Sequence, residues 1–315
     1  MSVPTPTDPL GRAYFEWTAE FTRFPGLSLP LLRWVFEDWQ RITAEPEDVT
    51  YASVTIGGVP GIKVTPLGAD PAQVLLVLHG GGFALGSSAS HRKLAGHIAK
   101  ACGATAFVAD FRLAPEHPYP AQIDDASSVI GALIDDGIRP DDITPVGDSA
   151  GASVAIATVL RRMRRGEPVP AQVITISPWL DMENSGATID TNDATDFLIS
   201  REGLQGNIDR YLSGGASPTD PLVNPLYADF SGFPRLFVTA SDAESLFADA
   251  ERLDRIARRD GADVTFSVAH CQQHVWPLQA GNLPAADASI AEIAAWYRAG
   301  RPDRTAAEPT FTTLN

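Results

Sequence analysis

The 315-residue chain has few of the residues that mark several classes of protein. Its two cysteines, Cys102 and Cys271, are far apart and form no C-x-x-C pair, so we expect free thiols in a reducing compartment. No apolar run approaches the roughly 20 residues that a membrane-spanning helix needs, and we expect no stable membrane insertion. No segment repeats at the period of a solenoid or a propeller, which excludes those architectures.

Positive charge is also scarce. The chain has 24 Lys and Arg residues against 39 Asp and Glu residues, a formal net charge of -15 at pH 7. Such a chain repels nucleic-acid phosphates and anionic membranes, so we expect no nucleic-acid partner. The first residues, MSVPTPTDPLGRAYFEW, lack the basic and apolar segments of a signal peptide. We therefore expect a cytoplasmic protein.

What the chain does have is an alternation of short apolar runs with helical segments. The apolar runs are 73–78, 105–109, 143–146, 173–176, 235–240 and 264–268. The helical patterns are 91–101, 121–136, 150–165, 244–260 and 286–299. An earlier strand pair, 51–56 and 61–66, flanks a Gly-Gly turn. Continuous apolar strands joined by helices predict an α/β fold, with a mostly parallel central sheet and helices on both faces.

Two segments fall outside this alternation, and we expect them to form a helical cap. One contains two amphipathic helices near the N-terminus, and the other is polar and irregular. The predicted division is N-terminal cap helices (1–45), a first core part (46–182), a cap insertion (183–225), a second core part (226–300) and a tail (301–315). Because ligands bind at the carboxyl ends of parallel strands, the motifs that follow the apolar runs should meet at one sheet edge.

The motif GDSAG (147–151) follows an apolar run and begins a helical pattern. A G-x-S-x-G sequence between a strand and a helix is the nucleophile elbow of serine hydrolases. Ser149 is therefore the candidate nucleophile, and the plain alternative is a serine that only caps the helix. The side chain of Asp148 should diverge from that of its neighbour Ser149, and we interpret it as structural.

A glycine cluster, HGGGF (79–83), ends another apolar run. Consecutive glycines expose backbone N–H groups, which acyl transfer needs where an oxyanion develops. We predict Gly81 and Gly82 as donors, with the N–H of Ala150 as the third. The glycine spacing and the lysine of a phosphate-binding loop are missing, and His79 is expected to orient the loop rather than act as a base.

A general base and an acid are expected late in the chain. His270 directly ends the run at 264–268, whereas His274 lies four residues farther and can reach over the sheet edge. We predict His274 as the base. Asp242 follows the end of an apolar run and Glu244 begins a helical pattern, where an acid is also favoured by the helix dipole. We predict Asp242 as the acid and keep Glu244 as its rival.

Taken together, the motifs resemble a known family. HGGGF and GDSAG occur with DFRLAPEHPYPA (110–121), SPWLD (177–181), ASDAE (240–244) and HVW (274–276). This set resembles the hormone-sensitive-lipase-like family of α/β-hydrolases, the bacterial type IV esterases. The resemblance implies an α/β-hydrolase fold with a helical cap, no metal and no cofactor. It also implies a catalytic triad of Ser149, Asp242 and His274, and an oxyanion hole of Gly81, Gly82 and Ala150.

The resemblance further implies a substrate class. Members of the family are serine carboxylesterases, so the expected partner is a small-molecule ester of short or medium chain length, or a lactone. The variants at 242–244 and 274–276 resemble a subgroup of acetyl-ester hydrolases and monoterpene lactone hydrolases. An amidase or carbamate hydrolase with the same triad is the alternative, followed by a catalytically silent ligand-binding protein.

Two structural expectations also come from the resemblance. Asp110, Arg112 and Glu116 should form a buried arrangement of ion pairs and hydrogen bonds near the site. The family suggests a homodimer that forms through an edge strand.

Overall fold

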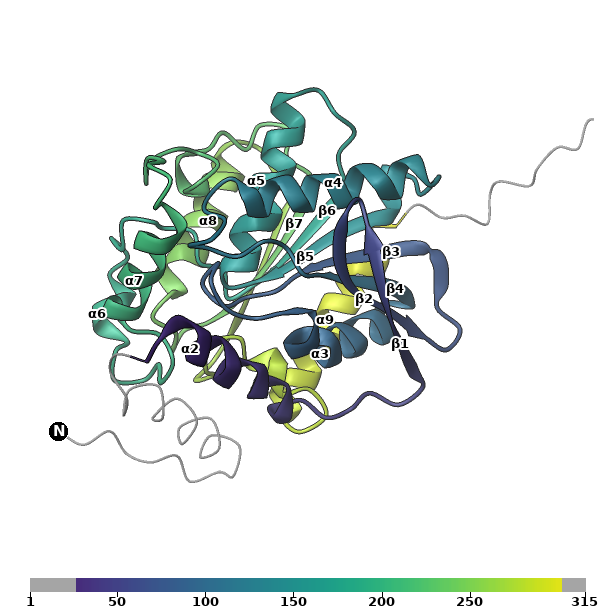
Figure 1. Ribbon diagram of the computed structural model, residues 1–315, viewed down its shortest axis with the longest axis horizontal. Helices are drawn as coiled ribbons and strands as arrows, with labels where there is room; N and C mark the ends of the chain where they lie inside the picture. The colour runs from purple at the N-terminus through teal and green to yellow at the C-terminus, as the bar shows by residue number, and fades with distance from the viewer. Residues whose placement is uncertain (1–26, 302–315) are drawn as a thin grey trace, which may run out of the picture.

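An eight-stranded, mostly parallel sheet runs through the molecule (Figure 1). The computed structural model describes residues 27–301. The strand order is β1-β2-β4-β3-β5-β6-β7-β8, in which β1 and β2 pair antiparallel, β2 and β4 pair antiparallel, and all other pairs are parallel. The strands are β1 (Val49–Ile56), β2 (Val59–Pro66), β3 (Asp70–Leu78), β4 (Ala104–Ala109), β5 (Ile143–Asp148), β6 (Gln172–Ile176), β7 (Arg235–Ser241) and β8 (Val264–Ala269).

Every predicted apolar run forms a strand of this sheet, because both faces of the sheet are covered by helices. In β3, Leu76 and Leu78 pack into one hydrophobic core, whereas Leu75 and Val77 pack into the other. Successive side chains of this wholly apolar strand point to opposite faces of the sheet, so the strand contributes to both hydrophobic cores. The predicted α/β architecture is confirmed.

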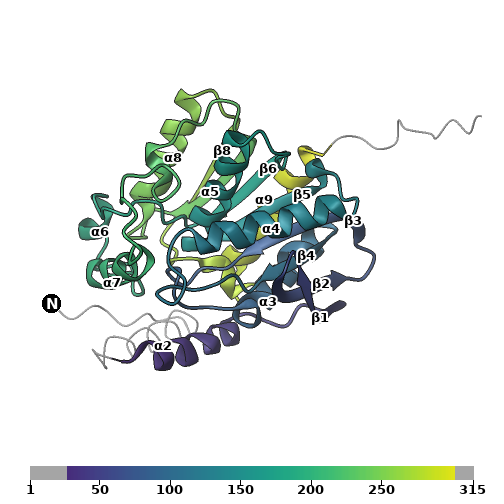
Figure 2. The same ribbon diagram turned by 45° about the horizontal axis from the view of Figure 1, so that its top comes forward.

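The helices form a layer on each face of the sheet (Figures 1 and 2). One layer contains α3 (Ser88–Cys102) and α9 (Pro284–Ala299), which contribute to the same core as Leu75. The other contains α4 (Ala121–Asp135), α5 (Ala150–Arg164) and α8 (Phe247–Arg259), which contribute to the core of Leu76. No helix within residues 27–301 is long and apolar enough to cross a bilayer.

The segments predicted as cap are short helices beside the sheet edge. They are α2 (Leu29–Phe36), the 3-10 helix η1 (Glu37–Ile42), α6 (Thr188–Thr191) and α7 (Arg201–Tyr211). Three further 3-10 helices, η2 (Pro140–Asp142), η3 (Pro225–Tyr227) and η4 (Trp276–Gln279), belong to connections. The first predicted N-terminal helix and nearly all of the predicted tail lie outside the described residues.

The expected joint arrangement of Asp110, Arg112 and Glu116 does not form. Asp110 accepts hydrogen bonds from the backbone and side chain of Ser88, Arg112 pairs with Asp125, and Glu116 pairs with Arg33 of α2. The side chain of Glu116 is 54% exposed and that of Arg112 is 47% exposed. The prediction of one buried network is therefore wrong, because each side chain turns toward a different element.

Candidate active site

Ser149 lies in a sharp turn between β5 and α5. Its backbone has φ 52° and ψ -122°, a strained conformation for a residue with a side chain. A Cβ atom on Gly147 would lie 2.3 Å from the Gly151 carbonyl oxygen, and one on Gly151 would lie 1.9 Å from the Leu78 oxygen. Only glycine fits at both positions. The two glycines therefore allow strand and helix to approach closely enough to present the hydroxyl of Ser149 at the sheet edge.

His274 joins Ser149 to a buried carboxylate. Its Nε2 lies 3.0 Å from Ser149 Oγ, and its Nδ1 lies 2.8 Å from Oε2 of Glu244. The next residue, Val275, is in the left-handed region with φ 54°, and its N–H donates to Ser177 Oγ at 3.0 Å. This bond fixes the loop that carries His274. The structure thus brings together the predicted nucleophile and the predicted base.

Asp242 does not contact His274, and the prediction that it is the acid partner is wrong. Its Oδ2 lies 2.7 Å from Nδ1 of His270, and its Oδ1 accepts the N–H of Cys271 at 2.8 Å. The side chains of His270 and Asp242 are 81% and 40% exposed. His270, the alternative to His274 as the base, therefore pairs with Asp242 at the surface. Glu244, the rival of Asp242 as the acid, lies in the buried site.

Glu244 reaches His274 because the chain folds back directly after β7. The N–H of Glu244 donates to the Ser241 oxygen at 3.1 Å, which closes a tight turn. Its Oε1 then accepts the Ser241 N–H and the Ser177 hydroxyl, both at 2.8 Å. Three hydrogen bonds to two carboxylate oxygens hold this buried group in place. Glu244 has a longer side chain than Asp242, and this difference was the signal in the sequence. The prediction chose Asp242 instead because Asp242 lies nearer the end of the strand.

The buried pair shifts the proton affinities of both partners. Burial alone would lower the pKa of His274, but the hydrogen bond and charge of Glu244, with smaller effects from Asp196 and Asp148, raise it above its ordinary value. Burial raises the pKa of Glu244 above its ordinary value, although His274 opposes that shift. An imidazolium formed at His274 is thus stabilised by the adjacent carboxylate.

The glycine loop lies beside Ser149. A Cβ atom on Gly80 would lie 2.3 Å from Asp148 Oδ2 and 3.2 Å from Ser149 Cβ. Gly81 and Gly82 have φ of 110° and 62°, which glycine adopts without strain. Within residues 27–301, the N–H groups of Gly81, Gly82 and Ala150 donate no hydrogen bond. These three amides are therefore free to donate to a bound ligand.

Asp148 fastens the glycine loop to the nucleophile turn. Its Oδ1 accepts the Gly80 N–H at 3.1 Å, and its Oδ2 lies 3.4 Å from Nε2 of His91. Burial opposes its charge, but the charge and hydrogen bond of His91 outweigh burial and lower the pKa of Asp148. Both carboxylate oxygens therefore have partners other than Ser149, which fits a structural role.

His79 contacts the same loop. Its Nδ1 donates to the Gly80 oxygen at 2.8 Å, and its ring stacks on Phe111 with centroids 4.3 Å apart. Burial, with the charge of His91, lowers the pKa of His79 to about 4. The ring is neutral at pH 7 and supports the loop.

Cap elements border the glycine loop from the opposite side. A Cβ atom on Gly82 would lie 2.2 Å from Nδ2 of Asn207 in α7, so a larger residue there would displace that side chain. Tyr211 of α7 stacks on Phe83 with centroids 3.8 Å apart. Arg33 of α2 donates to the Ala84 oxygen at 2.8 Å. The loop is thus enclosed between the sheet edge and the cap.

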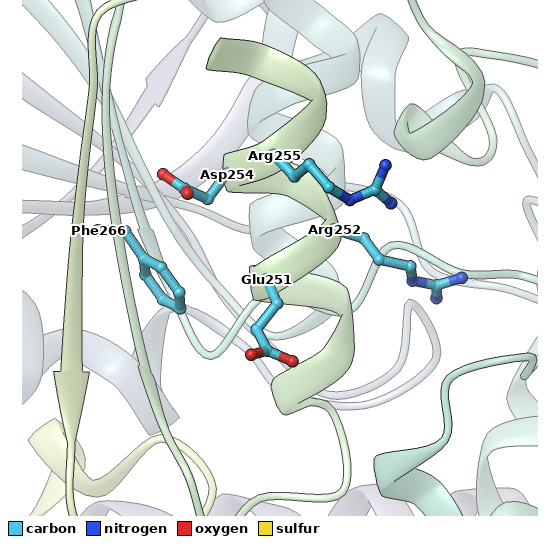
Figure 3. A pocket seen from close by; sticks show the side chains of 5 residues that line it. All are labelled: Glu251, Arg252, Asp254, Arg255 and Phe266. Carbon is cyan, nitrogen blue, oxygen red and sulfur yellow. The ribbon is translucent and has the colours of Figure 1, made fainter. Parts of the chain in front are cut away.

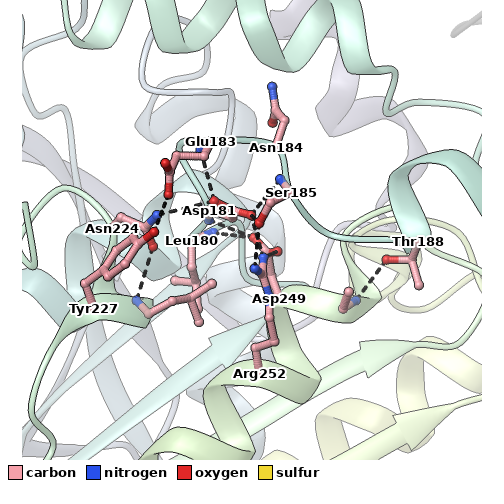
Figure 4. A network of polar contacts seen from close by, with 12 residues as sticks. Leu180, Asp181, Glu183, Asn184, Ser185, Thr188, Asn224, Tyr227, Asp249 and Arg252 are labelled. Carbon is pink, nitrogen blue, oxygen red and sulfur yellow. Dashed lines mark hydrogen bonds and ion pairs between the residues drawn. The ribbon is translucent and has the colours of Figure 1, made fainter. Parts of the chain in front are cut away.

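A polar network ties α8 to the loop after β6 (Figure 4). Asp249 Oδ2 accepts the N–H groups of Leu180 and Asp181 at 2.8 and 2.9 Å. Arg252 pairs with Asp181 at 2.7 Å and with Asp249 at 2.8 Å. Both carboxylates are buried. The network fixes the chain at the start of the cap insertion, a few residues after Ser177.

A surface pocket of about 420 Å³ lies between α8 and β8 (Figure 3). Its lining is largely charged and consists of Glu251, Arg252, Asp254, Arg255 and Phe266. None of Ser149, Glu244 and His274 lines it. The candidate site is therefore defined by the side-chain geometry around Ser149 and not by this pocket.

Known proteins are similar to this chain in sequence and in fold. Residues 75–278 match a family described by the alpha/beta hydrolase fold. The chain belongs to the α/β-hydrolase family. Among its relatives in this family, an acetyl-hydrolase of Streptomyces hygroscopicus is 35% identical over 83% of this chain and 86% of its own length. An esterase of Acinetobacter venetianus is 34% identical over 84% of this chain and 86% of its own.

Solved structures of α/β-hydrolases agree with these relatives. The crystal structure of an esterase from the bacterial hormone-sensitive lipase family has a TM-score of 0.89 and 34% identity, and the match covers 94% of this chain and 99% of that one. The predicted family resemblance is confirmed, and so is the predicted enzyme class, a carboxylic ester hydrolase.

Proposed function

We propose that the protein is a serine carboxylesterase that hydrolyses short- to medium-chain carboxylic esters or lactones. The observation that carries this proposal is the connected series Ser149–His274–Glu244, with contacts of 3.0 and 2.8 Å. In this series the hydroxyl is hydrogen-bonded to an imidazole, and the imidazole is hydrogen-bonded to a buried carboxylate. This arrangement activates serine as a nucleophile.

Acylation follows from this geometry. His274 Nε2 accepts the proton of Ser149 as its Oγ attacks the ester carbonyl carbon. Glu244 stabilises the imidazolium that results. The N–H groups of Gly81, Gly82 and Ala150 donate to the oxyanion, and they give up no other hydrogen bond to do so within the described residues. The alcohol leaves with the proton that His274 returns to it.

Deacylation uses the same groups in reverse. A water molecule gives its proton to His274 and attacks the acyl carbon on Ser149. The same three amides hold the second oxyanion. Ser149 regains its proton as the carboxylic acid leaves, and the enzyme returns to its starting state.

The enclosure of the glycine loop favours substrates with a small acyl group. Asn207 lies directly over Gly82, and the adjoining Phe83 is buried and stacked on the equally buried Tyr211. The similar protein from Streptomyces hygroscopicus is named an acetyl-hydrolase, which supports the same choice. We therefore place the preferred substrates at the short end of the ester series.

A series of p-nitrophenyl esters from acetyl to palmitoyl tests the proposal. The wild type and Ser231→Ala, a change at an exposed serine, should hydrolyse the short esters. Ser149→Ala should lose activity by roughly 10³-fold or more. A folded wild type that is inactive on every ester, or an active Ser149→Ala variant, would overturn it.

A further inference from the structure

One segment of the cap insertion contacts both loops that carry the acid and the base. We call residues 188–199 the clamp segment. At its start, Thr188 Oγ1 donates to the Ser245 oxygen at 2.8 Å and accepts the Ala248 N–H at 2.9 Å. Figure 4 shows the side chain of Thr188 beside α8. The clamp segment is therefore hydrogen-bonded to the residues that directly follow Glu244.

Two further side chains of the clamp segment hold the backbone around the acid. Asn192 Nδ2 donates to the Asp242 oxygen at 2.9 Å and to the Glu244 oxygen at 2.8 Å. Thr195 Oγ1 lies 2.9 Å from the oxygen between them, that of Ala243, and 3.0 Å from the Asn192 oxygen, so its one proton is shared between these two acceptors. Three successive carbonyl groups in the turn after β7 thus receive side-chain hydrogen bonds from the cap.

The clamp segment also holds the loop of the base. Gln273, the residue before His274, accepts the Phe197 N–H at 3.0 Å and donates to the Thr195 oxygen at 2.8 Å. Asp196, which is buried, accepts the Ser245 N–H at 2.8 Å. The two loops are therefore joined to each other through a third segment.

We propose that the clamp segment aligns Glu244 with His274, and that Asn192 is its principal positioning residue. This inference rests on the proposed function and concerns the acid–base half of the same site. Asn192 acts through the backbone, since its two donated bonds end on the residues that flank Ala243. Catalysis depends steeply on the placement of such groups, so a shift of this turn reduces the chemical step and leaves substrate binding largely intact.

A displaced turn should also change the pH dependence. The carboxylates that face His274 are Glu244, Asp196 and Asp148, and the first makes the hydrogen bond that stabilises the charged ring. A weaker bond to Glu244 lowers the pKa of His274. The acid limb of the activity profile should then move to lower pH.

The test compares kcat, KM and the pH profile on p-nitrophenyl butyrate. Asn192→Leu keeps about the size of the side chain, removes both donated hydrogen bonds and adds no charge near His274. Thr195→Val removes a single hydroxyl and is the second variant if the first does not fold. Asp193→Asn, exposed on the same segment, is the matched control.

Asn192→Leu should lower kcat by about tenfold or more with KM within about twofold, and its acid limb should move to lower pH. Thr195→Val should show a smaller loss of the same kind. Asp193→Asn should match the wild type. An increase in KM at constant kcat, or no change in either clamp variant, would overturn the inference. Absence of Ser149-dependent activity in the wild type would instead overturn the proposed function, so the two failures are distinguishable.

Discussion

Two acidic residues that are two positions apart, Asp242 and Glu244, have different environments. The first lies at the surface against His270, and the second is buried against His274. Both pairs have an imidazole Nδ1 within 2.8 Å of a carboxylate. Only the buried pair reaches a serine hydroxyl, so burial and connection to Ser149 separate the functional pair from the surface pair.

The raised pKa of His274 predicts the acid limb of the pH profile. The general base works only when neutral, so kcat/KM falls as the pH decreases through the pKa of His274. Glu244 and neighbouring carboxylates raise that pKa above its ordinary value of 6.5. The midpoint of the acid limb should therefore lie above pH 6.5 when kcat/KM for a p-nitrophenyl ester is followed between about pH 4 and 9. A midpoint below pH 6 would contradict the account.

Some residues of the site could be predicted from the sequence, and others could not. Ser149 was predictable because the elbow needs glycines at fixed positions, and the structure shows Gly147 and Gly151 with no room for a side chain. The acid was not, because its identity depends on the turn from Ser241 to Glu244. That turn is held by Ser177, which is distant in sequence.

At the scale of elements, the strands were predictable because burial on both faces leaves a continuous apolar run. Helix α5, for example, begins at Ala150 as expected. The connections were not predictable, because side chains distant in sequence decide them. Asn192 and Thr195 lie in a polar, irregular stretch, and no local pattern shows that they bind the turn after β7.

The network around Arg252 makes a prediction about stability. Arg252→Met would leave the buried carboxylates of Asp181 and Asp249 without their cation. The free energy of unfolding should fall by about 2–4 kcal/mol, a range discounted because the guanidinium is partly exposed. Urea unfolding measures it, with Arg255→Met, exposed on the same helix, as the control. Equal stability of the two variants would show that the network contributes little.

At the scale of the whole molecule, the sheet edge and the cap both contribute residues to the site. The carboxyl ends of β3, β5 and β7 carry the glycine loop, the nucleophile and the acid. The cap supplies Asn207 over Gly82 and the clamp segment against the acid and base loops. The cap thus contacts both halves of the site, and a change of cap sequence is expected to alter rate as well as substrate preference. The homodimer through an edge strand stays a prediction.

The most direct test of the Ser149–His274–Glu244 assignment compares Glu244→Gln with Asp242→Asn. Steady-state hydrolysis of p-nitrophenyl butyrate should show kcat reduced by roughly 10²- to 10⁴-fold in Glu244→Gln, because the partner that stabilises the imidazolium is lost. Asp242→Asn should stay within about twofold of the wild type. Loss of activity in Asp242→Asn together with a fully active Glu244→Gln would contradict the assignment.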